Sequence, residues 1–535
     1  MHSSIKYVLA FAILLPVLAG CVPQEVSLLP KPQSLEGSKN GFNVKSGFKI
    51  EVTDEKLDET SAYLAAFVDE WNEYICEDKQ VDEAGALPVS LALDKIGNDN
   101  PEAYELSVDK SGIMIKANFP QGCFYGIQTL RQLVKRDNGV LTLPQVKVSD
   151  YPDFGWRSYL LDEARHFYGK EFVKKMLDEL AALKINKFHW HLTDDAGWRI
   201  EIKKYPKLTE IGGFRNDTEI GTWESGKRSG KPHGGFYTQD DIKEIIEYAR
   251  LRHIQVIPEI EMPGHASAAI AAYPWLGILG ELKEVPAVFG KHKDSYNIAS
   301  PEVITFLQDV LDEVCELFPS EVIHVGGDEV LFDTWSASEE MKSYMKKNGL
   351  NSPADAQIKF TNDMSNYLES KGKRMMGWNE IMGKNVHNFE NTEDYGQVAT
   401  TLSKKTVIHF WRGEVELITE AAQKGYQIVN SLHTDTYLDY DYEKSPLKHM
   451  YQFSPIPEGL EKQYEKNIIG IGVQMWTEWQ PTYKNVEYQT FPRIAAASEI
   501  AWSGAGDYDD FLARLKNYST NWTARDINFP VEEIK

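Results

Sequence analysis

Cysteine is scarce in this sequence of 535 residues, which contains only four. Cys76, Cys123 and Cys315 lie beyond the N-terminal segment, and none of them belongs to a C-x-x-C pair. An odd number of cysteines at irregular spacing argues against a disulfide framework or a cysteine metal site. We expect these three side chains to be small buried hydrophobes.

Basic residues are also few, because 57 lysines and arginines stand against 80 aspartates and glutamates, a net charge of −23. This balance argues against a nucleic-acid partner, since phosphates are bound by Lys and Arg. It also argues against adhesion to anionic lipid through a basic face. Gly-rich phosphate-binding motifs do not follow the early predicted strands, which disfavours a nucleotide-binding fold.

Long apolar runs are absent except near the N-terminus, where residues 7–18 follow Lys6. This run is too short to span a bilayer and is typical of a signal peptide, which we place at residues 1–20. It ends in Leu18-Ala19-Gly20-Cys21, which resembles the bacterial lipobox. The resemblance implies that Cys21 is acylated and that the protein is a membrane-anchored lipoprotein of the bacterial cell envelope, periplasmic or at the cell surface. The alternative is a plain secretory signal with a chance cysteine.

Residues 22–150 have the pattern of a small α+β domain. Residues 104–108 and 113–117 alternate between polar and apolar side chains, and the turn at 109–112 joins them into a predicted hairpin. Residues 125–134 carry apolar side chains at helical spacing. Tyr151-Pro152-Asp153 marks the predicted boundary with the next domain.

From Trp156 onward, short apolar runs alternate with amphipathic segments, which indicates a parallel sheet. About eight such runs over ~350 residues favour a (β/α)8 barrel at 151–505 over an open sheet. A closing helix near 511–522 is predicted within the C-terminal tail, 506–535. The predicted strands are 158–162, 187–192, 255–260, 322–325, 374–377, 406–410, 427–430 and 468–475, and the predicted helices are 171–183, 238–252, 301–318, 356–370 and 414–424.

Acidic, aromatic and basic side chains follow nearly every predicted strand. Because the sites of (β/α)8 barrels form at the C-terminal ends of the strands, we expect these residues to meet in one site. In chain order they include Arg165, Asp194, His265, Asp328, Glu329, Trp378, Trp411, Tyr437, Asp439, Trp476 and Glu478.

The motif His324-Val325-Gly326-Gly327-Asp328-Glu329 ends the fourth predicted strand with two adjacent carboxyls. Their repulsion and partial burial raise one pKa, which suits a general acid at neutral pH. Strand neighbours normally point to opposite faces, but two glycines allow a bend that turns both acids toward one pocket. A solvated pair of acids in a loop is the alternative.

Trp378, Trp411 and Trp476 follow three different predicted strands. Converging indoles form an apolar wall on which the C–H face of a sugar ring can stack. For any one of these tryptophans taken alone, a position in the hydrophobic core is the alternative to a place in the binding wall. Arg165 and Glu478 can grip ring hydroxyls through charge-assisted hydrogen bonds, the alternative being a structural salt bridge.

His189 and His191 share one face of the second predicted strand, so a metal site is a rival interpretation. Barrel metallohydrolases need further ligands, and later strand ends here offer only His265 and His324 among Trp and acids. We therefore expect no metal, and we expect His265 to pair with Asp194 in support of the acid.

The motifs resemble those of the glycoside hydrolase family 20 β-N-acetylhexosaminidases, from Leu29-Pro30-Lys31-Pro32-Gln33 to about Trp502. The most specific are the motif at 324–329 and those at 162–167, 189–195 and 259–265. The resemblance implies a small α/β domain followed by a catalytic barrel. It implies an exo-acting hydrolase that removes terminal β-linked GlcNAc or GalNAc from glycans.

The same resemblance implies a role for each matching residue. Glu329 is the implied acid/base, Asp328 holds the acetamido nitrogen of the substrate, and Tyr437 binds the acetamido oxygen. The remaining matches fall into three groups: Arg165, Glu478 and Asp439 bind the sugar, Trp378, Trp411 and Trp476 enclose it, and Asp194 and His265 form the supporting pair.

In this family the acetamide oxygen of the substrate attacks C1, so the resemblance implies retention without a protein nucleophile, a metal or an organic cofactor. A lacto-N-biosidase or sulfated-hexosamine hydrolase, and an inactive sugar-binding lipoprotein, remain as alternatives. The segment 440–455 offers Tyr442 and Tyr451 where many relatives carry a further Trp. The loop at 212–235, rich in Gly and Arg, is expected to shape the choice of substrate.

Overall fold

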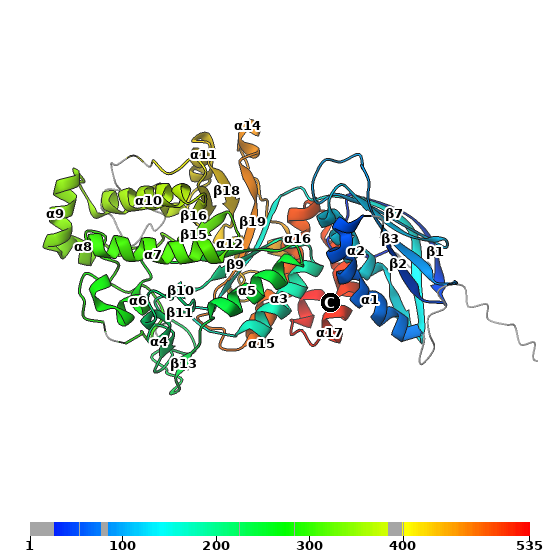
Figure 1. Cartoon of the computed structure of the whole chain (residues 1–535), viewed down its shortest axis with the longest axis horizontal. Helices are drawn as coiled ribbons and strands as arrows, with labels where there is room; N and C mark the ends of the chain where they lie inside the picture. The colour runs from blue at the N-terminus through cyan, green and yellow to red at the C-terminus, as the bar shows by residue number, and fades with distance from the viewer. Residues whose placement is uncertain are drawn as a thin grey trace, which may run out of the picture.

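The computed structural model describes residues 26–52, 54–75, 84–223, 225–282, 284–383, 399 and 401–535. The predicted signal peptide, Cys21 and Cys76 lie outside the described residues. Cys123 is buried and Cys315 is half-buried. None of the helices in the described part of the chain has the length and apolar character needed to cross a membrane. An N-terminal domain and a barrel follow one another along the long axis of the molecule (Figure 1).

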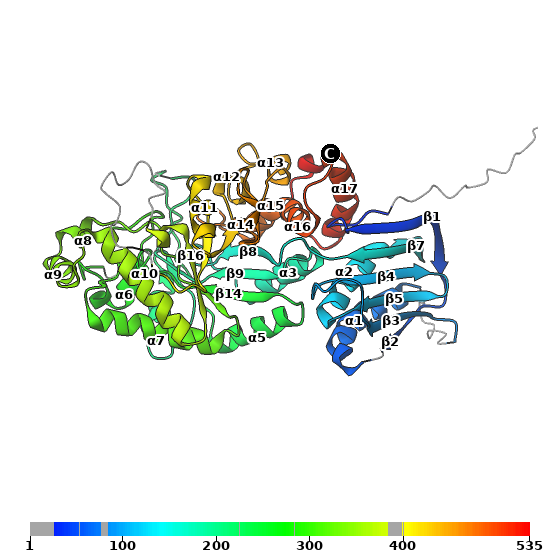
Figure 2. The same ribbon diagram turned by 90° about the horizontal axis from the view of Figure 1, so that it is seen from above.

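The N-terminal domain is a mixed sheet with two helices on one face. Its strands run in the order β1-β7-β4-β5-β3-β2, with β6 paired to β7. Helices α1 (Asp58–Ile75) and α2 (Pro120–Leu133) lie on the side of the sheet toward the barrel (Figures 1 and 2). The predicted hairpin is confirmed by the antiparallel pairing of β4 with β5. The strands are β1 (Ser34–Val44), β2 (Phe48–Val52), β3 (Leu87–Leu93), β4 (Tyr104–Asp109), β5 (Gly112–Ala117), β6 (Lys135–Asp137) and β7 (Val140–Asp150).

Eight parallel strands close into a barrel in the order β14-β15-β16-β17-β18-β19-β8-β9, which confirms the predicted fold class. Because apolar runs flanked by turn residues marked them clearly, the predicted strands agree with the observed bounds to within about two residues. The strands are β8 (Trp156–Asp162), β9 (Lys187–His191), β14 (Gln255–Glu259), β15 (Val322–His324), β16 (Arg374–Trp378), β17 (Val407–Phe410), β18 (Gln427–Asn430) and β19 (Ile468–Met475).

The five predicted barrel helices are confirmed, but the alternation is less regular than the sequence suggested. The described residues directly after β16 form only one short turn, η3 (Asn379–Met382). After β18 three short helices replace one long helix, because Pro446, Pro455 and Pro457 interrupt that segment. The helices are α3 (Lys170–Ala182), α5 (Gln239–Arg250), α7 (Pro301–Leu317), α10 (Pro353–Ser370), α11 (Val415–Gln423), α12 (His433–Thr436), α13 (Leu447–Tyr451), α14 (Lys462–Glu465), α15 (Tyr483–Thr490) and α16 (Arg493–Ser503).

The barrel interior changes character along its axis. Near the N-terminal ends of the strands it is an apolar layer of Trp156, Ile257, Val322, Met376, Val407 and Val429. Closer to the C-terminal ends the buried residues become polar and include His189, His324, His409 and Glu259. This polar layer forms the floor beneath the predicted site.

Buried ion pairs join the two domains. Arg157 of β8 pairs with Glu102 at 2.8 Å, and Lys184 pairs with Asp150 at 2.8 Å, with all four side chains nearly inaccessible. The predicted closing helix is confirmed as α17 (Tyr508–Ala524). Its Arg514 donates a hydrogen bond to the backbone oxygen of Leu28 at 2.9 Å, which ties the C-terminal helix to the start of the described chain.

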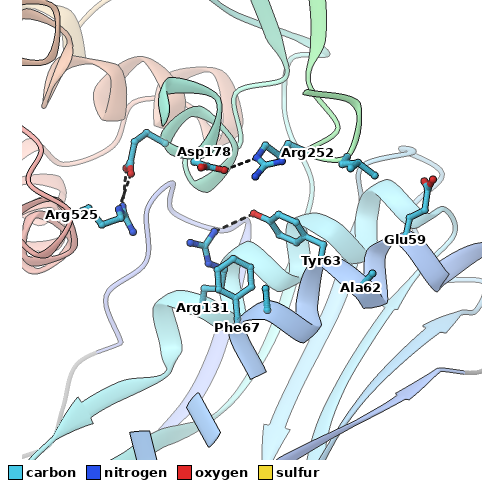
Figure 3. A pocket seen from close by; sticks show the side chains of 11 residues that line it. Glu59, Ala62, Tyr63, Phe67, Arg131, Asp178, Arg252 and Arg525 are labelled. Carbon is cyan, nitrogen blue, oxygen red and sulfur yellow. Dashed lines mark hydrogen bonds and ion pairs between the residues drawn. The ribbon is translucent and has the colours of Figure 1, made fainter. Parts of the chain in front are cut away.

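A cavity of about 550 Å³ lies between α1 and the barrel helices (Figure 3). Tyr63 and Phe67 of α1 line it together with Arg131 of α2, whose Nη1 donates to the Tyr63 hydroxyl at 3.4 Å. On the barrel side, Arg252 donates to Asp178 at 2.5 Å. Arg252 follows α5 and precedes β14, so this cavity lies at the N-terminal end of the barrel strands, away from the predicted site.

Candidate active site

The C-terminal ends of the barrel strands surround a second cavity, of about 490 Å³. It collects side chains from strands that are far apart in the sequence, as the strand-end pattern predicted. The predicted site residues that line it are Arg165, Asp194, His265, Asp328, Glu329, Trp411, Tyr437, Asp439, Trp476 and Glu478.

Trp378 is the predicted site residue that lies beneath the cavity instead of in its lining. It is still part of β16, so its side chain points into the barrel and is only 1% exposed. Its indole N–H donates to Glu259 at 2.9 Å, and its ring packs against Trp411 and Trp476 at centroid distances of 6.4 and 5.9 Å. Trp378 therefore supports the aromatic wall from below.

The turn after β15 places both adjacent acids in the cavity. Gly326 and Gly327 have φ values of +63° and +92°, a backbone conformation that glycine adopts easily. A Cβ atom at Gly326 would collide with the Glu261 carboxylate, which would have to move to make room for it. As the sequence predicted, this bend turns Asp328 and Glu329 to the same cavity, where their side chains are 13% and 21% exposed.

His265 lies behind this pair of acids. Its Nε2 is 3.9 Å from Asp328 Oδ2 and 3.7 Å from Glu329 Oε2. The sequence predicted that Asp194 would be its partner, but Asp195 is closer, with Oδ2 3.0 Å from His265 Nδ1 against 3.6 Å for Asp194 Oδ1. Both aspartates reach the imidazole because the chain turns back between β10 (Thr193–Asp194) and β11 (Gly197–Trp198).

The charges behind the acids are well defined. Burial alone would lower the pKa of His265, but Asp194 and Asp195 hold it well above its ordinary value, so the ring is an imidazolium at neutral pH. Burial alone would raise the pKa of Asp194, but Arg165 and His265 hold it well below its ordinary value. The charged form of His265 is therefore favoured on the side that faces Asp328 and Glu329.

Burial raises the pKa of Asp328 to about 8, and the nearby carboxylates of Glu380 and Glu329 add to the effect, while His265 opposes it. Burial also raises the pKa of Asp439 to about 8, with Glu478 as the next contributor. Within the described part of the chain, Asp328 Oδ1 and Asp439 Oδ1 are buried without a hydrogen-bond partner. Buried oxygens are normally bonded, so these two point to a ligand that brings N–H or O–H donors.

Arg165 is fixed by carboxylates on three strand ends. Its Nη1 lies 3.2 Å from Asp162, and its Nη2 lies 3.0 Å from Asp194 and 3.8 Å from Glu478. The guanidinium also stands over the Trp476 ring at 5.2 Å. Arg165 thus belongs to a buried salt-bridge network and also lines the cavity as a hydrogen-bond donor. The structural salt bridge and the ligand-binding donor, which the sequence offered as alternatives, are both present in this one residue.

Aromatic rings form one wall of the cavity. Trp411 and Tyr437 stack with their centroids 6.0 Å apart and their planes within 11°, and Tyr437 packs against Trp476 at 6.1 Å. The Trp411 indole N–H is anchored by Glu380 at 3.0 Å. A flat apolar surface beside buried carboxylates suits a ligand with a C–H face and polar edges, which is the surface of a sugar ring.

The histidines that suggested a metal site belong to the buried floor. Glu259 lies 3.0 Å from His189, 2.7 Å from His191 and 2.9 Å from His324. Although burial opposes it, Glu259 and Asp194 raise the pKa of His191 to about 10, whereas burial lowers the pKa of His189 to about 4. We interpret the group as a buried support in which Glu259 and His191 balance their charges.

Several cavity residues were missed by the sequence analysis. Trp223, within the loop expected to shape substrate choice, and Trp479 line the outer part with Tyr440. The two tyrosines singled out after Tyr440 do not line the cavity: Tyr442 donates to the Phe491 backbone, and Tyr451 donates to Glu499. No periodicity distinguishes these tyrosines in a segment of short helices and turns, so only the fold reveals which one faces the site.

Comparison with known proteins gives the same picture over most of the chain. The model of the glycosyl hydrolase family 20 catalytic domain matches residues 154–505, and the model of domain 2 of that family matches residues 25–151. The chain therefore belongs to glycosyl hydrolase family 20.

Individual relatives agree with this assignment. A β-hexosaminidase of Porphyromonas gingivalis is 34% identical over 95% of this chain, and the match spans 64% of that relative. A β-hexosaminidase of Vibrio furnissii is also 34% identical, over 90% of this chain and 76% of its own length. The crystal structure of a family 20 exo-β-N-acetylglucosaminidase of Vibrio harveyi in complex with N-acetylglucosamine superposes with a TM-score of 0.80 at 30% identity, covering 95% of this chain and 79% of that one.

Proposed function

We propose that this protein is a retaining β-N-acetylhexosaminidase that removes terminal β-linked GlcNAc or GalNAc from glycans. The observation that carries the proposal is the pair of adjacent acids, Asp328 and Glu329, which face one cavity backed by the His265 imidazolium. The family, the names of the relatives and the N-acetylglucosamine bound in the Vibrio harveyi structure support it. The cavity is closed below by Trp378 and the histidine floor, which favours attack on the end of a glycan chain.

In the first step of the proposed reaction, the acetamide oxygen of the substrate attacks C1 while the bond from C1 to the leaving oxygen breaks. Glu329 donates its proton to that oxygen, and an oxazolinium ion forms within the sugar. Asp328 accepts the acetamide N–H and stabilises the positive charge as it develops. The substrate carries its own nucleophile, so no carboxylate of the protein bonds to C1.

In the second step a water molecule gives its proton to Glu329 and attacks C1, which opens the oxazolinium ring with net retention. The acidic pair suits this sequence because repulsion between two adjacent, partly buried carboxyls favours a state in which one of them is protonated. An acetamide N–H directed at Asp328 favours its anion, and the shared proton then resides on Glu329, where the leaving oxygen needs it. The raised pKa of Asp328 in the free protein is consistent with this arrangement.

Recognition of the sugar falls to the remaining wall residues. Arg165 and Glu478 face the cavity from neighbouring strand ends, and the unbonded oxygen of Asp439 can accept a hydroxyl hydrogen. The test is a panel of aryl glycosides and defined disaccharides. We expect cleavage of β-GlcNAc and β-GalNAc ends with release of one sugar at a time, and a protein that binds these sugars without cleaving any of them would contradict the proposal.

We also propose that the mature protein is tethered to a membrane of the bacterial cell envelope by an acylated Cys21. The support is the sequence Leu18-Ala19-Gly20-Cys21 after an apolar run. Metabolic labelling with a fatty-acid analogue should mark the wild-type protein, and the Cys21→Ser variant should lose the label and fractionate as soluble. Unchanged membrane association of that variant would contradict the tether.

A further inference from the structure

One face of helix α1 forms a wall of the cavity between the two domains (Figure 3). The residues that line it recur every three or four positions, which places them on one stripe of the helix: Glu59, Ala62, Tyr63, Ala66 and Phe67. The cavity volume of about 550 Å³ is within the range of sites that hold small organic ligands. The proposed reaction takes place at the other end of the barrel strands and does not use this cavity.

The charged groups on the barrel side of the cavity are paired with one another. Arg525 binds both oxygens of Glu179, with Nε 2.7 Å from Oε1 and Nη2 2.8 Å from Oε2. Arg252 Nε donates to Asp178 Oδ1 at 2.5 Å, and the Tyr248 hydroxyl donates to Asp178 Oδ2 at 2.8 Å. These two arginines and two acids therefore balance each other's charge.

Arg131 of α2 differs from the other arginines of the lining. Its Nη1 donates to Gln128 Oε1 at 2.6 Å and to the Tyr63 hydroxyl at 3.4 Å. No carboxylate of the described residues forms an ion pair with Arg131, and its Nε and Nη2 have no acceptor among those residues. The guanidinium carbon stands 3.9 Å from the centroid of the Phe67 ring, which covers one of its faces.

The charge balance of the lining leaves the charge of Arg131 in excess. Glu59 is the third acid of the lining, but Arg250, which is not part of the lining, binds both of its oxygens at 2.8 and 2.7 Å. Burial raises the pKa of Glu179, and Arg525 and then Arg131 oppose this effect, yet both Glu179 oxygens are bonded to Arg525. A surplus cation in a cavity of a chain with net charge −23 favours an anionic ligand.

The Tyr63 hydroxyl provides a second donor beside Arg131 (Figure 3). It accepts from Arg131 Nη1 at 3.4 Å and from Gln128 Nε2 at 3.2 Å, and its own hydrogen has no acceptor within the described part of the chain. A guanidinium and a hydroxyl side by side suit the two oxygens of a carboxylate. Next to these donors, Phe67 and Leu251 present apolar surface, which suits a flat apolar body.

We propose that the cavity between the domains binds a small organic monocarboxylate with a flat apolar body. The carboxylate binds Arg131 and Tyr63, and the body lies between α1 and Leu251 of the barrel domain. This inference does not depend on the proposed function. Because such a ligand contacts both domains in the folded protein, its binding stabilises the fold, and turnover at the distant active site stays unchanged.

The test compares two ligands that differ only in the anionic group, 2-naphthoate and the uncharged 2-naphthamide. Calorimetric titrations use the full chain as wild type, Arg131→Met and Arg136→Met, each with and without saturating GlcNAc. Arg136 is the matched control because it belongs to the same domain and stands over the Tyr74 ring at 5.4 Å, but pairs with Glu70 and does not line the cavity.

We expect the wild type to bind 2-naphthoate at least about tenfold more tightly than 2-naphthamide, because a charged hydrogen bond is lost with the amide. Arg131→Met should lose that preference, and Arg136→Met should keep it within roughly twofold. The Tm of the wild type should rise with the concentration of 2-naphthoate. Ala66→Leu, which fills the cavity with a good helix former, should weaken the binding of both ligands.

Three results would overturn the inference. They are a wild type that does not prefer 2-naphthoate at millimolar concentrations, an Arg131→Met variant that unfolds cooperatively and keeps the wild-type preference, and displacement of 2-naphthoate by GlcNAc, which would place it in the active site. None of them bears on the proposed hydrolase, which is contradicted only by its own substrate panel.

Discussion

Glu329 is the residue on which the proposed chemistry depends, since it is the carboxyl that contacts both His265 and Lys291. Glu329→Gln keeps the shape of the side chain but cannot transfer a proton. We expect turnover of a natural disaccharide to fall by ~10²–10⁴ while product affinity stays near that of the wild type. Steady-state kinetics and calorimetric titration with GlcNAc measure the two quantities.

An activated substrate provides the internal control for this variant. A dinitrophenyl leaving group needs little help from an acid, so Glu329→Gln should lose much less in the first step with that substrate than with the disaccharide. Wild-type turnover of the disaccharide by Glu329→Gln would show that another group is the acid.

Asp328 links catalysis to stability. Burial raises the pKa of Asp328 in the folded protein to about 8, from an ordinary value of 3.8. The contribution of this carboxyl to stability is therefore complete below pH ~4 and is lost as the pH rises toward 8. Asp328→Asn cannot ionise, so we expect its Tm to exceed that of the wild type by about 1–3 °C at pH 8 and to match it near pH 4. Turnover of the variant should be strongly reduced.

Thermal unfolding across this pH range, with Asp240→Asn as the control, checks the expectation. Asp240 has a side chain that is 93% exposed, so removing its charge should leave the pH dependence of Tm unchanged. A Tm of Asp328→Asn below that of the wild type at pH 8 would mean that the buried carboxylate is stabilised by its surroundings.

At the scale of an element, the turn after β15 determines the site. Gly326→Ala brings a side chain into the Glu261 carboxylate at a positive φ, so we expect a loss of about 2–4 kcal/mol in the free energy of unfolding and of most activity. Gly349→Ala is the matched control, because Gly349 has φ +67° after α9 (Glu339–Asn348) and open space around it.

The control should cost only about 1 kcal/mol and leave kcat/KM intact. Urea unfolding and kinetics on the two variants separate the collision at Gly326 from backbone strain alone. Equal effects of the two substitutions on both quantities would show that contact with Glu261 does not fix the turn.

The same scale shows what sequence patterns could and could not predict. The barrel strands were found because each is a short apolar run that ends in polar residues, and the two glycines before Asp328 revealed the bend. The partner of His265 was only half predicted, because adjacent Asp194 and Asp195 differ only in the direction that a short hairpin gives them. Trp378 was predicted to line the cavity because its position at the strand end could not show whether the ring faces the cavity or the barrel interior beneath it.

At the scale of the whole molecule, a buried charge pair holds the N-terminal domain on the barrel. Glu102→Gln leaves Arg157 buried without a carboxylate, so we expect a loss of about 3–5 kcal/mol in the free energy of unfolding. Glu59→Gln, in the exposed pair of Glu59 with Arg250 across the same boundary, should leave the free energy of unfolding nearly unchanged, because solvent screens that pair. Neither variant should change kcat, because both pairs lie far from the rim.

The pH dependence of this effect follows from the sign of the pKa shift. Burial alone would raise the pKa of Glu102, but Arg157 holds it below its ordinary value of 4.5. The pair therefore stabilises the fold above pH ~4.5 and loses this contribution as the pH falls through the folded pKa. Chemical unfolding at pH 7 and pH 3 should show the difference between wild type and Glu102→Gln shrinking, and a difference that grows on acidification would contradict the assignment.

The sequence could suggest two domains but not how they meet. The buried interface between the domains pairs Glu102 with Arg157 and Asp150 with Lys184, residues that lie far apart in the sequence and belong to no local pattern. The cavity at this interface is not marked by a sequence motif either. The acidic site was predictable because its residues follow strands, whereas Trp223, which also lines the cavity, comes from an irregular segment that lacks periodicity. The prediction was therefore strongest where backbone geometry repeats and weakest where only the tertiary fold brings residues together.

The central claim is that the substrate supplies its own nucleophile, and the most direct measurement compares an aryl β-N-acetylglucosaminide with the matching aryl β-glucoside. Well-oriented intramolecular attack can reach effective molarities of ~10⁵–10⁸ M, so replacing the acetamide by a hydroxyl should remove nearly all activity. The account predicts negligible cleavage of the glucoside. Comparable turnover of the two substrates, or a sugar ester trapped on a carboxylate of the protein, would contradict it.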